Sequence, residues 1–310
     1  MSPKRGGRDR NFPREEHPGD SYYGRPIINP PVWEEREIAG YLFTGGLAGA
    51  SSILAAGADL TGRPALARGS RGMAIGAIGV SLAALIKDLG RPERFLNMLR
   101  VFKPTSPMSV GVWILVGYTP LAAGAAASDV LGRLPREGRI AGLGAAVFGS
   151  AVATYTAALI ANTAVPAWHE GRRELPYLFA GSAASAAAGW GLIVAPRTEN
   201  EPAVRMAVLG ALVELGAEQA MERRLGMIAE TLQEGKAGKR LKIAKALTAA
   251  GAMGARLLAR RNRPAAIAAG AGLLAGSALT RFGLFEAGMA SARDPKYTVE
   301  PQRQRLAARG

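Results

Sequence analysis

The chain has 310 residues, 48% of them hydrophobic, with no cysteine and a formal net charge of +15. Without cysteine it can form neither a disulfide nor a thiolate-ligated zinc or iron-sulfur centre. In a soluble protein the basic excess would favour nucleic acid, but here Lys and Arg gather between long apolar runs, as in membrane proteins. Nucleic acid is therefore not an expected partner.

Residues 1–33 are rich in Arg, Pro, Gly and Asp and have no apolar periodicity. No short apolar core precedes a cleavage site of small residues, so this segment is not a secretory signal. We expect a polar, flexible tail on the cytoplasmic side.

Apolar runs follow the tail. A spanning helix needs about 20 mostly apolar residues. Five runs are uncharged: 38–58, 72–86, 104–128, 140–168 and 175–196. The second is short, and it extends through Lys87 and Asp88 if Lys87 reaches back to the surface. Asp88 then lies near the membrane interface.

Three further segments, 203–221, 243–258 and 264–280, complete the predicted bundle. The first two contain the charged residues Glu214, Glu218, Lys245 and Arg256, and the seventh segment has the weakest apolar pattern. The sequence thus predicts an all-α integral membrane protein, a bundle of about eight transmembrane helices over residues 34–285, with a polar C-terminal tail at 286–310.

The distribution of basic residues predicts how the chain is oriented in the membrane. With eight spans, most of the 39 Lys and Arg residues fall on the side of the two termini. Because basic loops stay in the cytoplasm, both termini are predicted to be cytoplasmic in a multi-pass protein of the cell (cytoplasmic or inner) membrane.

Polar residues at membrane depth are the candidate functional groups, because such residues are costly there. Glu37 and Tyr41 share a helix face and can present a carboxylate and a phenol to a quinone head group. Tyr155 in the fourth segment is predicted at a similar depth. The alternatives are a Glu37 that faces headgroup water and a Tyr155 that only fills space.

Glu214 and Glu218 also lie four residues apart on one face. Two interpretations stay open for them. They form a proton path, or they pair with Lys245 or Arg256 as a structural link between helices.

The charged loop between the second and third segments is the candidate docking surface for a partner protein. Its basic residues include Arg91, Arg94 and Lys103, and the loop after the fourth segment adds Trp168. The alternative is that these are ordinary basic loops on the cytoplasmic side.

Several of these segments resemble the NrfD/PsrC membrane subunits of polysulfide-reductase-type molybdenum oxidoreductases, over about residues 33–192. The resemblance rests on Tyr41-Leu42-Phe43-Thr44-Gly45-Gly46-Leu47-Ala48-Gly49, Asp88-Leu89-Gly90-Arg91-Pro92-Glu93-Arg94-Phe95, and Tyr155-Thr156 leading to Pro166-Ala167-Trp168.

The resemblance implies an eight-helix subunit that binds menaquinone or ubiquinone as a substrate and holds no haem or iron-sulfur cluster. It implies partners in an iron-sulfur (ferredoxin-like) subunit and a molybdopterin-containing catalytic subunit. By matching motifs, Glu37, Tyr41 and Tyr155 inherit the quinone site and Asp88 a role in proton handling, so Glu37 and Asp88 are the catalytic candidates. The chain would be one component of an oxidoreductase, not its terminal catalytic subunit.

Two other functions remain as alternatives. An ion-coupled secondary transporter would use Glu214, Glu218 and Asp88, although no inverted repeat or paired helix break is apparent. A purely structural membrane anchor would bind no quinone. No motif of a soluble enzyme occurs in the sequence.

Overall fold

This computed structural model describes residues 27–88 and 97–307, and these residues form only helices and connecting segments. The long helices are α1 (Glu35–Leu60), α2 (Pro64–Asp88), α4 (Pro107–Leu131), α5 (Pro135–Ala161), α7 (Leu175–Val194), α8 (Glu201–Leu225), α10 (Gly235–Leu258) and α11 (Arg263–Arg293). The short ones are α6 (Pro166–Glu170), η1 (Gly171–Arg173), η2 (Gly226–Ala229), α9 (Glu230–Gln233) and α12 (Lys296–Ala307). The predicted all-α bundle of about eight long helices is confirmed.

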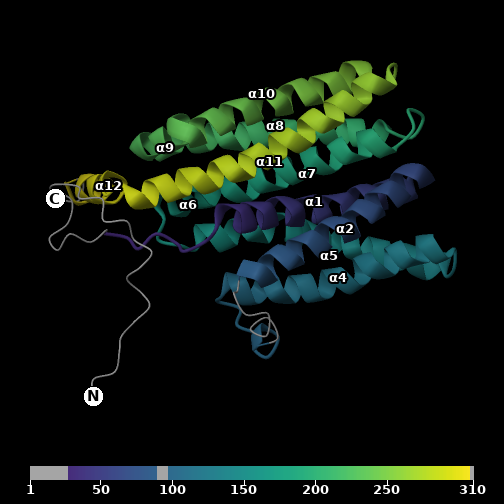
Figure 1. Ribbon diagram of the computed structural model, residues 1–310, viewed down its shortest axis with the longest axis horizontal. Coiled ribbons are helices and arrows are strands. Elements are labelled where there is room, and N and C mark those ends of the chain that lie inside the picture. Colours follow the sequence, from purple (N-terminus) through teal and green to yellow (C-terminus); the bar gives the residue numbers. More distant parts are fainter. Residues whose placement is uncertain (1–26, 89–96, 308–310) are drawn as a thin grey trace.

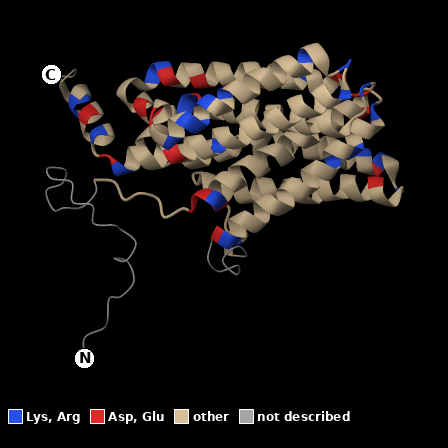
Figure 2. Cartoon of the chain, turned by 45° about the horizontal axis from the view of Figure 1, so that its top comes forward, with Lys and Arg blue, Asp and Glu red and all other residues tan. Residues whose placement is uncertain are grey.

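Six of the long helices, α1, α2, α4, α5, α7 and α11, are long and apolar enough to cross a membrane. Figure 2 shows the charged residues gathered near the two ends of the bundle, with the middle of α1, α4 and α5 free of them. α8 and α10 contain more charged residues, but at 25 and 24 residues they are as long as the others. The chain is therefore a multi-pass membrane protein.

The bundle has two halves, α1, α2, α4 and α5 in one and α7, α8, α10 and α11 in the other (Figure 1). α1 lies between them and packs on α2, α5, α7 and α11. Successive long helices run in opposite directions (Figure 1). We call the end where α1 begins and α11 ends the terminal end, and the other the far end.

Small residues set the closest helix contacts. Gly49 of α1 lies against Gly149 of α5, and Gly181 of α7 against Gly210 of α8, so that backbone meets backbone. Lipid removes most of the hydrophobic drive between helices, and close approach of small residues supplies packing energy instead. These glycines therefore let α1 pack closely on α5, and α7 on α8, within each half of the bundle.

A substitution tests this packing. Gly49→Ala is expected to destabilise the protein by about 1–3 kcal/mol, because the added methyl group overlaps the Gly149 carbonyl. Gly57→Ala on the same helix is the control, since a Cβ there meets nothing within 4 Å. Thermal unfolding in detergent measures both. Equal unfolding temperatures for the two variants would contradict this account.

Several helix boundaries differ from the sequence prediction. α2 begins at Pro64, not near Gly72, because Arg71 is ion-paired inside the bundle. The predicted run 140–168 is divided: α5 ends at Ala161 and Trp168 belongs to α6, since Pro166 cannot continue the preceding helix. α11 continues through Arg281 to Arg293, past the end predicted near Thr280.

Arg71 joins three helices near the far end. Its Nη1 donates to both carboxylate oxygens of Asp129 on α4, at 2.6 and 2.7 Å, and its Nη2 donates to Asp59 on α1. The Arg71 side chain is 10% exposed. An arginine so deep in the bundle is tolerated because two carboxylates face it.

Candidate functional site

Glu37 lies in the first turn of α1 and is 8% exposed. Its Oε1 accepts a hydrogen bond of 2.6 Å from Nζ of Lys87, in the last turn of α2. An acid at a helix start and a base at a helix end both interact favourably with the helix dipoles. The second carboxylate oxygen, Oε2, is buried and has no hydrogen-bond partner among the described residues.

Lys87 was predicted to extend towards the surface. Its side chain is 74% exposed, and the ammonium group folds back onto Glu37. The pair therefore joins the start of α1 to the end of α2, and it brings a proton donor and acceptor together at the edge of the membrane.

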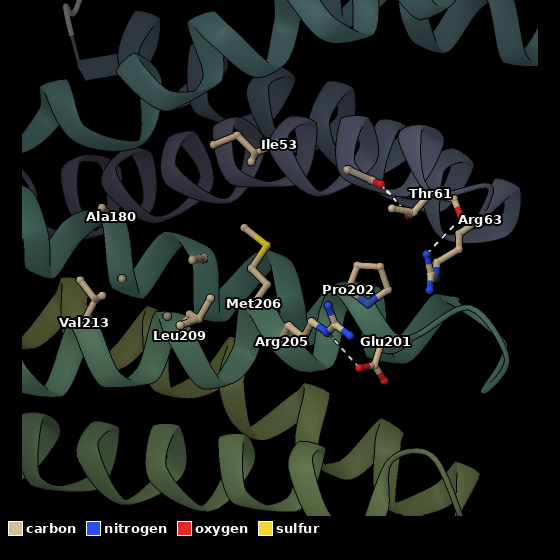
Figure 3. A pocket seen from close by; sticks show the side chains of 14 residues that line it. Ile53, Thr61, Arg63, Ala180, Glu201, Pro202, Arg205, Met206, Leu209 and Val213 are labelled. Carbon is tan, nitrogen blue, oxygen red and sulfur yellow. Dashed lines mark hydrogen bonds and ion pairs between the residues drawn. The ribbon is translucent and has the colours of Figure 1, made fainter.

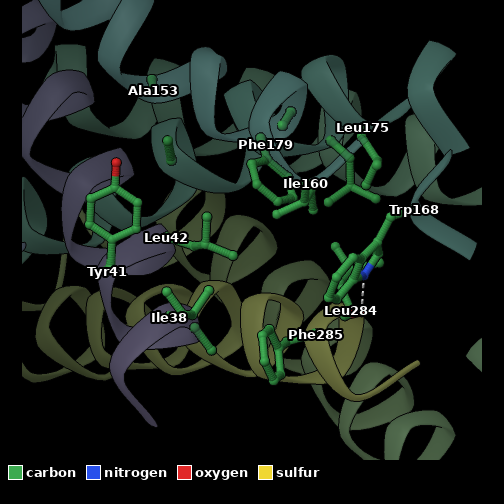
Figure 4. Packing of buried hydrophobic residues seen from close by; sticks show 14 of the residues in the cluster. Ile38, Tyr41, Leu42, Ala153, Ile160, Trp168, Leu175, Phe179, Leu284 and Phe285 are labelled. Carbon is green, nitrogen blue, oxygen red and sulfur yellow. Dashed lines mark hydrogen bonds between the residues drawn. The ribbon is translucent and has the colours of Figure 1, made fainter. Parts of the chain in front are cut away.

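Tyr41 lies one turn after Glu37 and is 2% exposed. The Ser81 hydroxyl of α2 donates to the Tyr41 carbonyl at 3.3 Å. In Figure 4 the phenol oxygen points towards the side of the bundle where Ala153 of α5 lies. The structure thus brings Glu37 and Tyr41 to one end of α1, with the phenol deeper than the carboxylate.

Asp88 is the last residue of α2, next to Lys87, and is partly exposed. It lies at the terminal end, where α1 begins. The rest of the Asp-Leu-Gly-Arg-Pro motif, which contains Arg91, and the following Arg94 lie outside the described residues.

Tyr155 lies six residues before the end of α5, as Tyr41 lies six residues after the start of α1, so the two share a similar depth. Its ring packs against Gly111 of α4 and is half-buried. Within residues 27–88 and 97–307, no hydrogen bond joins Tyr155 to Tyr41 or Glu37. The structure therefore brings Glu37, Tyr41 and Asp88 together on α1 and α2, and places Tyr155 at the interface of α4 and α5.

The predicted docking residues have different surroundings. Lys103 is exposed in the segment before α4. Trp168 is 1% exposed, stacks on Trp33 at 5.9 Å between ring centres, and donates from Nε1 to the Leu284 carbonyl at 2.9 Å (Figure 4). Its ring is thus not available to a partner, contrary to the prediction. The Trp168 side chain instead connects α6 to α11. A large aromatic side chain whose N–H group has a hydrogen-bond partner is well suited to a buried position.

Ion pairs cover the terminal end around Trp168. Arg224 donates to Glu174 at 2.6 Å, and this bond holds the pKa of the Glu174 carboxyl below its usual value. Lys296 donates to Glu230 at 2.8 Å and lowers the pKa of that carboxyl. These carboxylates are therefore ionised at neutral pH, and part of the basic charge on this surface is neutralised.

The second half of the bundle holds buried charges. Lys245 of α10 lies 2.6 Å from Glu222 and 3.5 Å from Glu218, whereas Arg256 is exposed. Glu214 accepts a 2.8 Å hydrogen bond from Thr280. Sequence analysis did not single out Glu222, although it continues the spacing of four residues. It also missed Arg281, because the predicted eighth span ended one residue earlier.

A groove of about 610 Å³ opens between α1, α7 and α8 (Figure 3). It is lined mainly by apolar side chains, with the ion pair of Arg205 and Glu201 at one end. Its lining runs from Thr61 and Glu201 at the far end to Ala180 and Val213 further along the bundle. None of the predicted site residues lines it.

The amino-acid composition limits which metal centres the chain can bind. The sequence has no cysteine, and within the described ranges no three His, Asp or Glu side chains are grouped to hold a metal ion.

Comparison with known protein families relates the chain to one of them. No curated protein matches the chain. The family described as polysulphide reductase, NrfD, matches residues 28–254, a region from the segment before α1 into α10. This match covers most of the chain and agrees with the apolar helices and the motifs of α1 and α5. The chain therefore belongs to the NrfD family of polysulphide-reductase-type membrane proteins.

Proposed function

We propose that the chain is the quinone-interacting membrane subunit of a multi-subunit oxidoreductase. It exchanges electrons between the membrane quinone pool and an iron-sulfur partner, which passes them to or from a molybdopterin enzyme. Membership of the NrfD family supports this function, and so does the absence of cysteine, because the electrons then belong to a bound quinone and to a partner.

The arrangement of Glu37 is the single observation that supports the site best. Its Oε1 is held by Lys87, while Oε2 is buried and has no partner in the part of the chain that the structure describes. An unpaired buried carboxylate oxygen is costly, and a hydrogen bond from a bound hydroxyl group would satisfy it. The residues therefore fit a quinol head group, which supplies two electrons and two protons when bound.

Each residue has a role in this proposal. Glu37 accepts and releases a proton, and Lys87 stabilises its ionised form. Tyr41 and Tyr155 hold the head group by their hydroxyl groups and rings. Asp88, at the surface end of α2, exchanges protons with water. Menaquinone and ubiquinone both present the oxygen atoms that these side chains need.

Partner docking is proposed at the terminal end, where the loop with Arg91, Arg94 and Lys103 leaves α2. A bound quinone near Glu37 would be close to an iron-sulfur subunit on this surface. The basic residues of this end indicate the cytoplasmic side of the cell membrane for both termini. These assignments are part of the proposal.

Purification of the complex tests the function. We expect the tagged full-length protein, extracted in mild detergent, to bring down an iron-sulfur and a molybdopterin subunit, both identified by mass spectrometry. Solvent extraction of the same sample should yield quinone. Partners without quinone would favour a structural anchor, and a chain with neither would favour a transporter.

A further inference from the structure

A row of carboxylates in the second half of the bundle has no role at the proposed quinone site. Glu214, Glu218 and Glu222 are each four residues apart on α8, so neighbours lie on one face with Cβ atoms about 5–6 Å apart. The Glu222 side chain is 12% exposed, whereas Glu218 and Glu214 are 2% and 1% exposed. The row therefore leads from the terminal end into the interior.

The outer end of the row contacts Lys245 of α10. Its Nζ lies 2.6 Å from Oε1 of Glu222 and 3.5 Å from Oε1 of Glu218, and its side chain is one third exposed. One ammonium group thus links the two outer carboxylates. This part of the row is also an ordinary ion-pair cluster, so it does not by itself indicate more than a structural role.

At the inner end of the row, around Glu214, several buried polar atoms have no hydrogen-bond partner among the described residues. Oε1 of Glu214 accepts from the Thr280 hydroxyl at 2.8 Å, but Oε2 is buried without a partner among the described residues. The next residue of α11, Arg281, is 1% exposed and donates from Nη2 to the Phe179 carbonyl at 2.8 Å. Its Nε and Nη1 also have no partner in the described part of the chain.

Glu214 and Arg281 therefore do not form a direct ion pair with all of their polar atoms hydrogen-bonded. A buried ion pair that only holds helices together needs direct contact and satisfied hydrogen bonds to offset the loss of hydration. Here no ion pair within 4 Å joins the two residues, and the guanidinium carbon lies 3.6 Å from the Phe179 ring centre instead. Burial favours a protonated Glu214, whereas the positive charge on Arg281, the residue after Thr280, favours an ionised one.

The three carboxylates of the row lie at different depths in the membrane. Eleven residues separate Glu214 from the end of α8 at Leu225, about 16 Å along the helix. This is about half the 30 Å thickness of the hydrocarbon core. Glu214 and Arg281 thus lie near the middle of the membrane, while Glu222, three residues before the end of α8, lies nearer the terminal end.

We propose that Glu222, Lys245, Glu218 and Glu214 form a proton path between the water at the terminal end and the middle of the membrane beside Arg281. In each step one O–H or N–H bond breaks as another forms, so no oxidant or reductant is needed. The path goes beyond the proposed quinone function, whose residues lie on α1, α2 and α5. Its elements are α8, α10 and α11, with Ser182 and Ser185 of α7 adding polar groups but no charge to this interior.

Infrared spectroscopy of the full-length protein in detergent tests the path directly. We expect a carbonyl band of a protonated carboxyl group that shifts when H2O is replaced by D2O. Glu214→Gln should remove this band. Glu218→Gln should keep it but slow its isotope shift at least tenfold, since the step between Glu214 and the surface is interrupted. Glu201→Gln, the same change at the start of α8, is the control and should alter neither.

Two results would overturn the proposal: a band that persists in Glu214→Gln, or an isotope shift as fast in Glu218→Gln as in the unaltered protein. Gel filtration checks that each variant is folded. If Glu218→Gln does not fold, Lys245→Met interrupts the same entrance and should slow the shift by a similar factor. The measurement needs no quinone and no partner, so its outcome is independent of the proposed electron-transfer function.

Discussion

Glu37→Gln is expected to lower quinol-linked electron transfer by about 100-fold or more, while the subunits still assemble. The amide keeps the size of the side chain and can still contact Lys87, but it cannot accept a proton from a bound quinol. The measurement is the rate at which the purified complex reduces an artificial acceptor with a water-soluble quinol. Tyr155→Phe, which removes only a hydroxyl group, should abolish most of the same activity.

Glu35→Gln is the matched control. Glu35 lies two residues earlier in the same helix turn, pairs with Arg240 and is 41% exposed at its side chain. It faces α10 rather than α2, so its loss should leave electron transfer nearly unchanged. Normal turnover in both Glu37→Gln and Tyr155→Phe, with subunit content equal to that of the unaltered complex, would remove the proposed site.

Arg71→Met is expected to destabilise the bundle by about 3–5 kcal/mol, the usual cost of removing one partner from a buried ion pair. The long apolar side chain fills much of the same volume. It leaves the carboxylates of Asp59 and Asp129 without their shared guanidinium, so α1, α2 and α4 lose their common link near the far end. Unfolding in mixed detergent micelles gives the change in free energy.

Arg68→Met is the control for this variant, because Arg68 lies on the same helix and is exposed. It should change the stability by a few tenths of a kcal/mol, as most surface substitutions do. Adding Asp59→Asn and Asp129→Asn to Arg71→Met should recover most of the loss, since no unpaired charge then remains. An Arg71→Met protein as stable as Arg68→Met would show that the cluster contributes nothing.

The bundle could be predicted from the sequence because a membrane imposes a simple length rule. The runs that became α1, α4 and α7 are uncharged over about 20 residues, and such a segment satisfies its backbone hydrogen bonds in lipid only as a helix. The errors arose where charges interrupt an apolar run. Arg71 and Arg281 looked like helix ends, yet both lie inside helices because side chains of other helices surround them.

The candidate site was predictable only in part. The spacing of Glu37 and Tyr41 places them on one helix face, which follows from helix geometry alone. Lys87 as the partner of Glu37 did not follow, since 50 residues separate them. Trp168 was expected at the surface because its neighbours are charged, but the arrangement of α6 against α11 turns its ring inward.

By itself the sequence determined the helical membrane fold, the absence of thiolate-bound metal centres, and the polar residues placed within apolar segments. These depend on composition and on local spacing. Only the tertiary structure decided which of those polar groups meet: Glu37 with Lys87, Arg71 with Asp59 and Asp129, and Glu214 beside Arg281 but not paired with it. The physical reason is that a buried charge is stabilised by groups on neighbouring helices, and helix packing alone brings those groups together.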